Sequence, residues 1–311
     1  MNTLLKRALM TVNFISGKNM TAEELKKHRT LAEWAGRLAA PKGDLAINKF
    51  RVGKIRCEEV IPDFAHNPNY AILYAHGGGY VSGGLDYARI LAGKMAIATG
   101  FSAYSFAYRL APEHPYPAAL DDGMAVWEYL VENKYEADHI ILAGDSAGGN
   151  LALCMVQKLI SENKPHPKEL LLFSPWTDMS GTASSYETNK KLDPILTGEY
   201  VMNASKAYIG DEDPYEPRFS PLFGDFTGFP PIYIMAGRNG ILLDDSIRLK
   251  EKAEQAGIKV WLDIEEKGWH VYQQMPIPIA KNAMKRLSEH ISNEIYVSNQ
   301  KIESLKSDQL K

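Results

Sequence analysis

A serine set among glycines is the first residue in this sequence with the surroundings of a catalytic group. The hexapeptide Gly144-Asp145-Ser146-Ala147-Gly148-Gly149 follows an apolar strand-like run, 139–143, and precedes an apolar helix-like run, 150–156. Gly-x-Ser-x-Gly between a strand and a helix is typical of a nucleophile elbow, whose tight turn holds the serine hydroxyl clear of the sheet. The following helix directs free N–H groups to the same place. A plain Gly/Ser-rich turn is the alternative interpretation.

A second motif upstream offers hydrogen-bond donors. His76-Gly77-Gly78-Gly79-Tyr80 comes directly after a short apolar run, 71–75. Successive glycines leave their backbone N–H groups open to an oxyanion that a side chain would block. We therefore predict an oxyanion hole made of the N–H groups of Gly78, Gly79 and Ala147. A flexible loop or a phosphate-binding nest are the alternatives, and no Gly-Lys-Ser/Thr follows to favour the nest.

His270 is the candidate base. It lies in Lys267-Gly268-Trp269-His270-Val271-Tyr272, after the last predicted strand and before the last predicted helix. From such a loop its ring can reach the elbow and accept the Ser146 proton. Proteins with a nucleophile elbow also have the chain order serine, acid, histidine. Most of the eight histidines are expected to be structural or exposed, with His139 and His166 at the surface and His114 anchoring a loop.

Alternating strand-like and helix-like segments predict the framework that positions these residues. Strands are expected at 71–75, 101–107, 139–143, 170–173, 232–236 and 260–264, and helices at 85–100, 117–132, 245–256 and 277–297. This alternation predicts a mostly parallel sheet with helices on both faces. Residues 45–61 alternate polar and apolar side chains, which favours a pair of antiparallel edge strands before it.

Two segments lie outside the alternation. Residues 1–40 read as two helices, the second starting at a Thr21/Glu24 capping box. Residues 176–229 are rich in Tyr, Asp, Pro and Ser with a helix-like centre at 198–209, which is more typical of an inserted functional cap than of a loop. We expect cap helices in residues 1–44 and a catalytic domain in 45–311, with 176–229 inserted into the cap, as a lid over the carboxyl ends of the strands.

The overall composition limits the classes of partner. The chain has 311 residues, 45% of them hydrophobic, and a net charge of −3. That allows a sizeable α/β core and gives no reason to expect nucleic acid or an anionic membrane as partner. Cys57 and Cys154 lie in apolar patterns and are expected as buried free thiols. The N-terminus reads as an amphipathic helix and not a signal peptide, and no run is long enough for a membrane span, so a cytoplasmic protein is expected.

Four motifs together resemble the hormone-sensitive-lipase-like branch of the α/β-hydrolases, the bacterial carboxylesterase and acetyl-hydrolase group. The resemblance spans about residues 71–272, and its motifs are 76–79, 108–119, 144–149 and 174–178. It implies an α/β-hydrolase fold: a mostly parallel eight-stranded sheet flanked by helices, with a helical cap built from the N-terminus and an insertion after the sixth strand. It also implies no cofactor, no metal, and hydrolysis of short-chain acyl esters.

The same resemblance assigns roles to individual residues. Ser146 is the nucleophile and His270 the base. Asp145 supports the elbow. Glu113 and either Asp121 or Asp122 organise the loop beneath the site by hydrogen bonding.

One position departs from the family pattern. After strand 232–236 the family has Gly-x-x-acid-x-Leu-x-Asp-Asp/Glu, and in residues 237–245 here the acid is replaced by Gly240. Asp244 is the first spare candidate for orienting His270, with Asp245 beside it, and both also suit the N-cap and first turn of helix 245–256. Asn239 could hold the imidazole tautomer without fully stabilising its charge. Loss of the acid costs on the order of 10⁴ in turnover.

The sequence thus predicts a serine esterase acting on a small-molecule ester, impaired if nothing replaces the acid. Apolar lining is expected from Trp34, Tyr80, Trp176, Tyr200 and Tyr208. A ligand-binding pseudo-hydrolase is the rival from another class. An amidase or transacylase with the same residues also stays open, because the acyl-enzyme is shared. No nucleic acid is expected, and a homodimer is left open.

Overall fold

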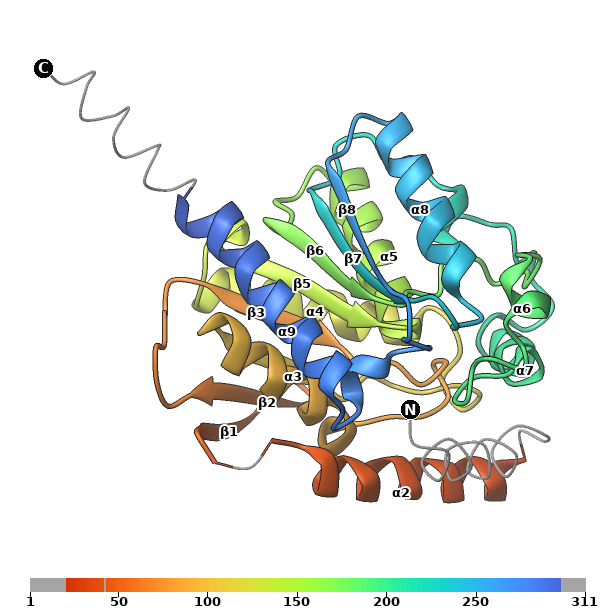
Figure 1. Cartoon of the computed structure of the whole chain (residues 1–311), viewed down its shortest axis with the longest axis horizontal. Coiled ribbons are helices and arrows are strands. Elements are labelled where there is room, and N and C mark those ends of the chain that lie inside the picture. Colours follow the sequence, from red (N-terminus) through yellow and green to blue (C-terminus); the bar gives the residue numbers. More distant parts are fainter. Residues whose placement is uncertain (1–20, 42, 298–311) are drawn as a thin grey trace, which may run out of the picture.

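The computed structural model describes residues 21–41 and 43–297. Within them, eight strands form one sheet in the order β1-β2-β4-β3-β5-β6-β7-β8 (Figure 1). The strands are β1 (Leu45–Val52), β2 (Ile55–Pro62), β3 (Ala71–Ala75), β4 (Ser102–Phe106), β5 (Ile140–Asp145), β6 (Glu169–Phe173), β7 (Ile232–Gly237) and β8 (Val260–Glu265). β2 runs antiparallel to β1 and β4, and every other neighbouring pair is parallel. The predicted sheet and its antiparallel edge pair are confirmed.

Helices cover both faces of the sheet (Figure 1). They are α3 (Leu85–Thr99) and α9 (Pro278–Ile291) on one face and α4 (Ala118–Asn133), α5 (Ala147–Ser161) and α8 (Leu243–Gln255) on the other. Along β3, Ile72 and Tyr74 pack with α3 and α9, while Leu73 packs with α4 and α5. This division follows from the two-residue period of a strand, which sends successive side chains to opposite faces. The central strands are apolar on both sides and therefore lie fully inside the molecule.

The two segments outside the alternation contribute α2 (Ala22–Ala39), α6 (Ser185–Thr188) and α7 (Gly198–Ile209). Thr21 caps α2 as predicted, since its hydroxyl accepts the Glu24 N–H at 3.3 Å and donates to the Glu24 carboxylate at 2.9 Å. The helix-like centre at 198–209 is confirmed as α7. The described residues also contain four short helical segments: η1 (Ala137–His139), η2 (Pro221–Phe223), η3 (Tyr272–Gln274) and η4 (Ser292–Val297). The helix predicted before residue 21 and the polar tail from Ser298 lie outside the described residues.

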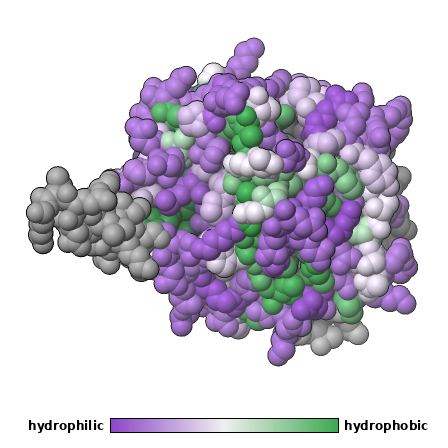
Figure 2. Space-filling model, turned by 90° about the horizontal axis from the view of Figure 1, so that it is seen from above, coloured by the Kyte–Doolittle hydropathy of each residue, from purple (hydrophilic) through white to green (hydrophobic). Residues whose placement is uncertain are grey.

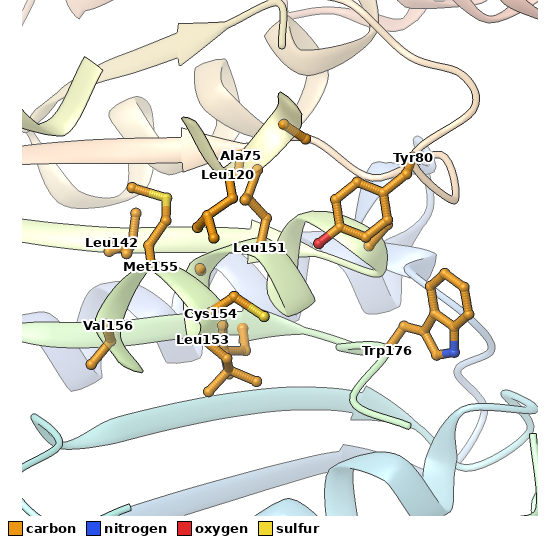
Figure 3. Close-up of a cluster of buried hydrophobic side chains, with 14 of the residues drawn as sticks. Ala75, Tyr80, Leu120, Leu142, Leu151, Leu153, Cys154, Met155, Val156 and Trp176 are labelled. Atoms are coloured by element: carbon orange, nitrogen blue, oxygen red, sulfur yellow. The ribbon is translucent and has the colours of Figure 1, made fainter. Parts of the chain in front are cut away.

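The helix after the elbow is packed against the sheet at very short range. Its side chains Leu151 and Met155 lie in the buried cluster that also contains Leu142 of β5 and Leu120 of α4 (Figure 3). A Cβ built at Gly148 would overlap the carbonyl of Ala75 in β3. Glycine is therefore required where α5 begins, because only backbone without side chains allows this approach. The elbow is thus anchored to the most buried part of the fold.

Cys57 and Cys154 are both free and buried, as expected. Figure 2 shows a face on which hydrophilic residues cover most of the surface and hydrophobic residues gather toward the middle. In the part of the chain that the structure describes, no helix combines the length and the apolar character needed to cross a bilayer.

Candidate active site

Ser146 sits at the bend between β5 and α5. Its backbone has φ 54° and ψ −120°, a conformation that costs free energy for any residue with a side chain and persists only when the surroundings hold it. Its N–H donates to the carbonyl of Phe173, and its own carbonyl accepts the N–H of Trp176, both at 3.0 Å. The end of β6 and the loop that follows it therefore hold the strained turn through both the N–H and the carbonyl of Ser146. The serine is 8% exposed.

Asp145, directly before the serine, connects three parts of the site. Its buried carboxylate accepts hydrogen bonds from the Tyr74 hydroxyl at 2.5 Å, the Gly77 N–H at 2.7 Å, the Gln274 amide at 3.2 Å and the Tyr87 hydroxyl at 3.3 Å. Burial raises its pKa to about 6, and the hydrogen bonds work against that rise. Asp145 ties the elbow to the glycine loop and to the loop after His270, which agrees with the supporting role predicted for it.

The glycine loop presents unused donors. Gly78 and Gly79 have φ of 110° and 64°, values at which a side chain would be strained. A Cβ at Gly78 would also overlap the Ser82 carbonyl, and one at Gly79 would lie 3.0 Å from the Ala204 side chain. Among residues 21–41 and 43–297, no hydrogen bond uses the N–H of Gly78, Gly79 or Ala147. The three predicted oxyanion donors are therefore free to bind another acceptor.

The structure brings His270 to the same cavity as the elbow and the glycine loop. Ser146, His270, Gly78 and Gly79 all line a cavity of about 180 Å³. Ala147 is the first residue of α5, next to the serine. His270 is 5% exposed, and this burial lowers its pKa to about 3, so that the ring is neutral at pH 7. Its Nδ1 is buried and makes no hydrogen bond with any residue of the described chain.

The turn after β7 lies against this histidine. The N–H of Gly240 donates to the Gly237 carbonyl at 3.0 Å. A Cβ built at Gly240 would lie 3.2 Å from the His270 backbone nitrogen. The position that the family pattern gives to the acid therefore faces His270, but it carries no side chain.

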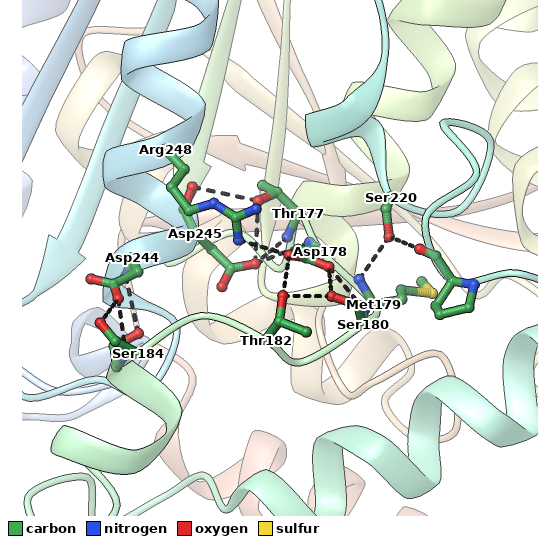
Figure 4. Close-up of polar contacts among 12 residues, drawn as sticks. Thr177, Asp178, Met179, Ser180, Thr182, Ser184, Ser220, Asp244, Asp245 and Arg248 are labelled. Carbon is green, nitrogen blue, oxygen red and sulfur yellow. Dashed lines mark hydrogen bonds and ion pairs between the residues drawn. The ribbon is translucent and has the colours of Figure 1, made fainter.

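The spare acids contact other partners (Figure 4). The Asp244 carboxylate accepts the Ser184 hydroxyl at 2.6 Å and the Ser185 N–H at 2.9 Å. The Asp245 carboxylate accepts the Thr177 N–H at 2.7 Å, and burial raises its pKa to about 7. Neither carboxylate, nor the Asn239 amide, is hydrogen bonded to His270 in the described part of the chain. α8 begins at Leu243 with Leu242 as its N-cap, so the expected N-cap role of the two aspartates is wrong and both lie in the first turn.

The loop beneath the site is held by hydrogen bonds, as the resemblance implied, and the structure distinguishes Asp122 from Asp121. Arg29 of α2 pairs with both carboxylate oxygens of Glu113, at 2.9 and 2.8 Å. Asp122, which is buried, accepts the N–H and guanidinium of Arg109, whereas Asp121 is exposed. Asp122 is therefore the structural member of that pair. His114, which was predicted to anchor a loop, is exposed.

Two of the five predicted lining residues reach the cavity. Trp176 and Tyr200 line it, together with His28 and Ala32 of α2 and Val201 and Ala204 of α7. Tyr80 and Tyr208 stack on each other instead, with ring centres 3.7 Å apart. Trp34 is 58% exposed. His28 was missed by sequence reasoning, although its helical spacing from Leu25 and Ala32 placed it on the inner face of α2.

No cluster of metal-ligating type occurs in the described chain: no group of three or more His, Cys, Asp or Glu side chains there could hold a metal ion. The cavity itself presents the Ser146 hydroxyl, the neutral imidazole of His270 and backbone N–H groups of the glycine loop. Those groups are the ones needed for acyl transfer.

Comparison with known proteins decides the family. A model of the α/β-hydrolase fold matches residues 72–274. The chain belongs to the α/β-hydrolase family. This hydrolase is 36% identical to an esterase of Acinetobacter venetianus over 81% of its own length and 84% of the relative's. It is 33% identical to an acetyl-hydrolase of Streptomyces hygroscopicus, over 76% and 77% of the two chains.

A solved structure supports the same branch of the family. An esterase of the bacterial hormone-sensitive lipase family superposes with a TM-score of 0.87 at 30% identity, covering 95% of this hydrolase and 99% of that chain. The predicted resemblance and fold class are therefore confirmed. This α/β-hydrolase is an enzyme of the carboxylesterase type that hydrolyses esters.

Proposed function

We propose that this α/β-hydrolase is a serine esterase that cleaves short-chain acyl esters through an acyl-enzyme. The observation that carries the proposal is the shared cavity, which Ser146, His270, Gly78 and Gly79 all line. The Ser146 hydroxyl attacks the ester carbonyl while His270 accepts its proton through Nε2, because Nδ1 is buried. The imidazolium then gives the proton to the leaving alcohol, and water repeats the sequence on the acyl-enzyme.

The oxyanion donors supply most of the stabilisation in this mechanism. The N–H groups of Gly78, Gly79 and Ala147 bind the oxygen that becomes negative in the tetrahedral intermediate, each contributing roughly 3–4 kcal/mol by analogy with donor removal in another hydrolase. The base is the weaker part. Burial lowers the pKa of His270 to about 3, so the imidazolium is disfavoured. With Gly240 in place of the acid we expect slow but real turnover.

The walls of the cavity favour short acyl chains. Its volume is about 180 Å³, and α2 and α7 close it on the side away from the sheet with His28, Ala32, Tyr200, Val201 and Ala204. We assign these two elements to a cap made of residues 1–44 and the insertion 176–229, over a catalytic domain of 45–311. The name of the acetyl-hydrolase relative agrees with a small acyl group.

The test compares p-nitrophenyl acetate with p-nitrophenyl octanoate, using wild type, Ser146→Ala and, as a matched control, Ser161→Ala at the exposed end of α5. We expect faster acetate than octanoate hydrolysis, reduced to background by Ser146→Ala and unchanged by Ser161→Ala. Acetate hydrolysis that persists in Ser146→Ala would remove the mechanism.

One observation favours a second candidate, a catalytically weak pseudo-hydrolase that mainly binds ligands. The buried Nδ1 of His270 has no partner in the described chain, and Gly240 offers none. A serine-directed sulfonyl fluoride separates the two cases. Labelling of Ser146 with no measurable ester turnover would favour the pseudo-hydrolase.

Cleavage of p-nitroacetanilide, or acyl transfer to an added alcohol, would favour the amidase or transacylase.

A further inference from the structure

The turn that contains Gly240 is held by side chains from the 176–229 insertion. The Asn189 amide donates to the carbonyls of Arg238 at 3.0 Å and Gly240 at 2.8 Å. The Asp193 carboxylate accepts the N–H of Ile241 through Oδ2 at 3.0 Å. The insertion is therefore fixed to the same turn that lacks the family's acid.

Asp193 also faces the candidate base. The backbone N–H of His270 is directed at its carboxylate and favours the charged form. The other oxygen, Oδ1, accepts the N–H groups of Ile195 at 2.9 Å and Leu196 at 3.1 Å. The side chain is 4% exposed, and burial raises its pKa to about 6. At pH 7 a buried negative charge therefore lies beside His270.

The other acids near the site are hydrogen bonded to groups other than His270. Asp244 is bound to Ser184 and Ser185 of the α6 region, and Asp245 to Thr177. Asp145 is hydrogen bonded to Tyr74 and Gly77 beneath the elbow. Among the described residues, the Asp193 carboxylate is bonded to the Gly240 turn and faces the backbone N–H of His270. In a buried site such a charge acts over more than a hydrogen-bond length, because little water screens it.

We propose that Asp193 is a positioning residue which holds His270 in place and stabilises its imidazolium by charge, performing part of the task of the acid missing at Gly240. This inference rests on the serine mechanism proposed above. The charge works through space and through the backbone, since the Nδ1 of His270 has no hydrogen bond to any described residue. It is supplied by the insertion and not by the loop after β7.

The decisive experiment is a double-mutant cycle between Asp193→Asn and Gly240→Glu. In wild type, Asp193→Asn should lower kcat for p-nitrophenyl acetate by about tenfold or more, the equivalent of one pKa unit at the base, with little change in KM. In the Gly240→Glu background the same change should cost less than about twofold, because a carboxylate at position 240 then supplies the charge.

Asn189→Ala is the matched control. It removes the neutral clamp on the same turn and leaves the charge of Asp193 in place. Its cost should be equal with Gly240 and with Gly240→Glu. Equal costs of Asp193→Asn in both backgrounds would assign Asp193 a structural role only and overturn the proposal.

The pH profile supplies a readout that a structural role would not move. As pH falls through about 6, Asp193 takes up a proton, so wild-type kcat should decline there, and the part of the decline that Asp193 causes should be absent in Asp193→Asn. Asp145 and Asp245 have pKa values raised to about 6 and 7, and any limb that they cause persists in the variant. An unchanged limb in Asp193→Asn would overturn the proposal.

A conservative variant covers the case in which Asp193→Asn fails to fold. Asp193→Glu keeps the charge, and the limb near pH 6 should shift in this variant if the carboxylate controls it. A limb unmoved in folded Asp193→Glu would contradict the proposal. Esterase activity that survives Ser146→Ala would instead reject the serine mechanism, so the two failures are distinguishable.

Discussion

The nucleophile side of this site is held by many hydrogen bonds, whereas the histidine side is held by few. On the nucleophile side, the strained Ser146 is clamped by Phe173 and Trp176, and the Asp145 carboxylate beneath it accepts four hydrogen bonds. On the histidine side, the Nδ1 of His270 is buried without a partner in the described chain.

The difference shows that the two halves depend on different kinds of interaction. Elbow geometry comes from glycines, strand ends and a buried hydrogen-bond network, so many residues maintain it together. The strength of the base depends on one charge beside one ring nitrogen, which a single substitution removes. A family member can therefore keep its nucleophile intact while its base is weakened.

After loss of the Ser146 hydroxyl itself, the largest effect is expected from Gly78→Ala. The new Cβ would overlap the Ser82 carbonyl, and φ at this position is +110°, so the loop must move and its N–H leaves the oxyanion position. We expect acetate turnover to fall by about 10²–10³, measured as kcat. Gly198→Ala in α7, whose Cβ has 3.7 Å to its neighbour, should leave turnover unchanged. Normal turnover in folded Gly78→Ala would remove Gly78 from the oxyanion hole.

The next-largest effect is expected from Asp145→Asn, which weakens the nucleophile side. An amide cannot accept all of the hydrogen bonds that the carboxylate accepts from Tyr74, Gly77, Tyr87 and Gln274. We expect a loss of about 1–3 kcal/mol in unfolding free energy by denaturant titration, with turnover lower by about 10². Asp245→Asn, which changes an equally buried carboxylate bound to Thr177, should lose stability with a smaller loss of turnover. Equal turnover losses would mean that Asp145 has no particular link to the elbow.

Gly240→Glu should strengthen the base on the histidine side. A carboxylate placed beside His270 favours its charged form and raises its pKa, so kcat should rise by about tenfold or more. Gly240→Ala adds only the Cβ, 3.2 Å from the His270 nitrogen, and should give no gain. If both variants behave alike, the absence of an acid at 240 does not limit the rate.

The smallest effect is expected from Asp244→Asn. Its Oδ2 accepts both the Ser184 hydroxyl and the Ser185 N–H, so an Asn oxygen in that place can keep both bonds and only the negative charge is lost. We expect kcat within about twofold of wild type and a stability loss of about 1 kcal/mol, checked by kinetics and thermal unfolding. A collapse of kcat with an unchanged fold would instead support Asp244 as the residue that orients His270.

Local sequence determined much of this protein. The elbow, the glycine loop, the Thr21 cap of α2 and the bounds of α7 were all readable because backbone sterics and hydrophobic periodicity act between neighbours in the chain. The start of α8 was placed too late because Asp244 and Asp245 resemble an N-cap, whereas Leu242 occupies that position. Leu242 and Leu243 are both buried at this helix start.

Tertiary structure alone decided the surroundings of His270. Nothing near Asp193 in the chain distinguishes it from an ordinary loop aspartate, yet the fold brings its carboxylate to the Gly240 turn and the His270 backbone. Likewise, only the fold shows that Asp244 faces α6 and that Trp34 points outward. Motifs fix which groups are present, but the electric field at a buried ring depends on charges that meet only when distant segments pack together.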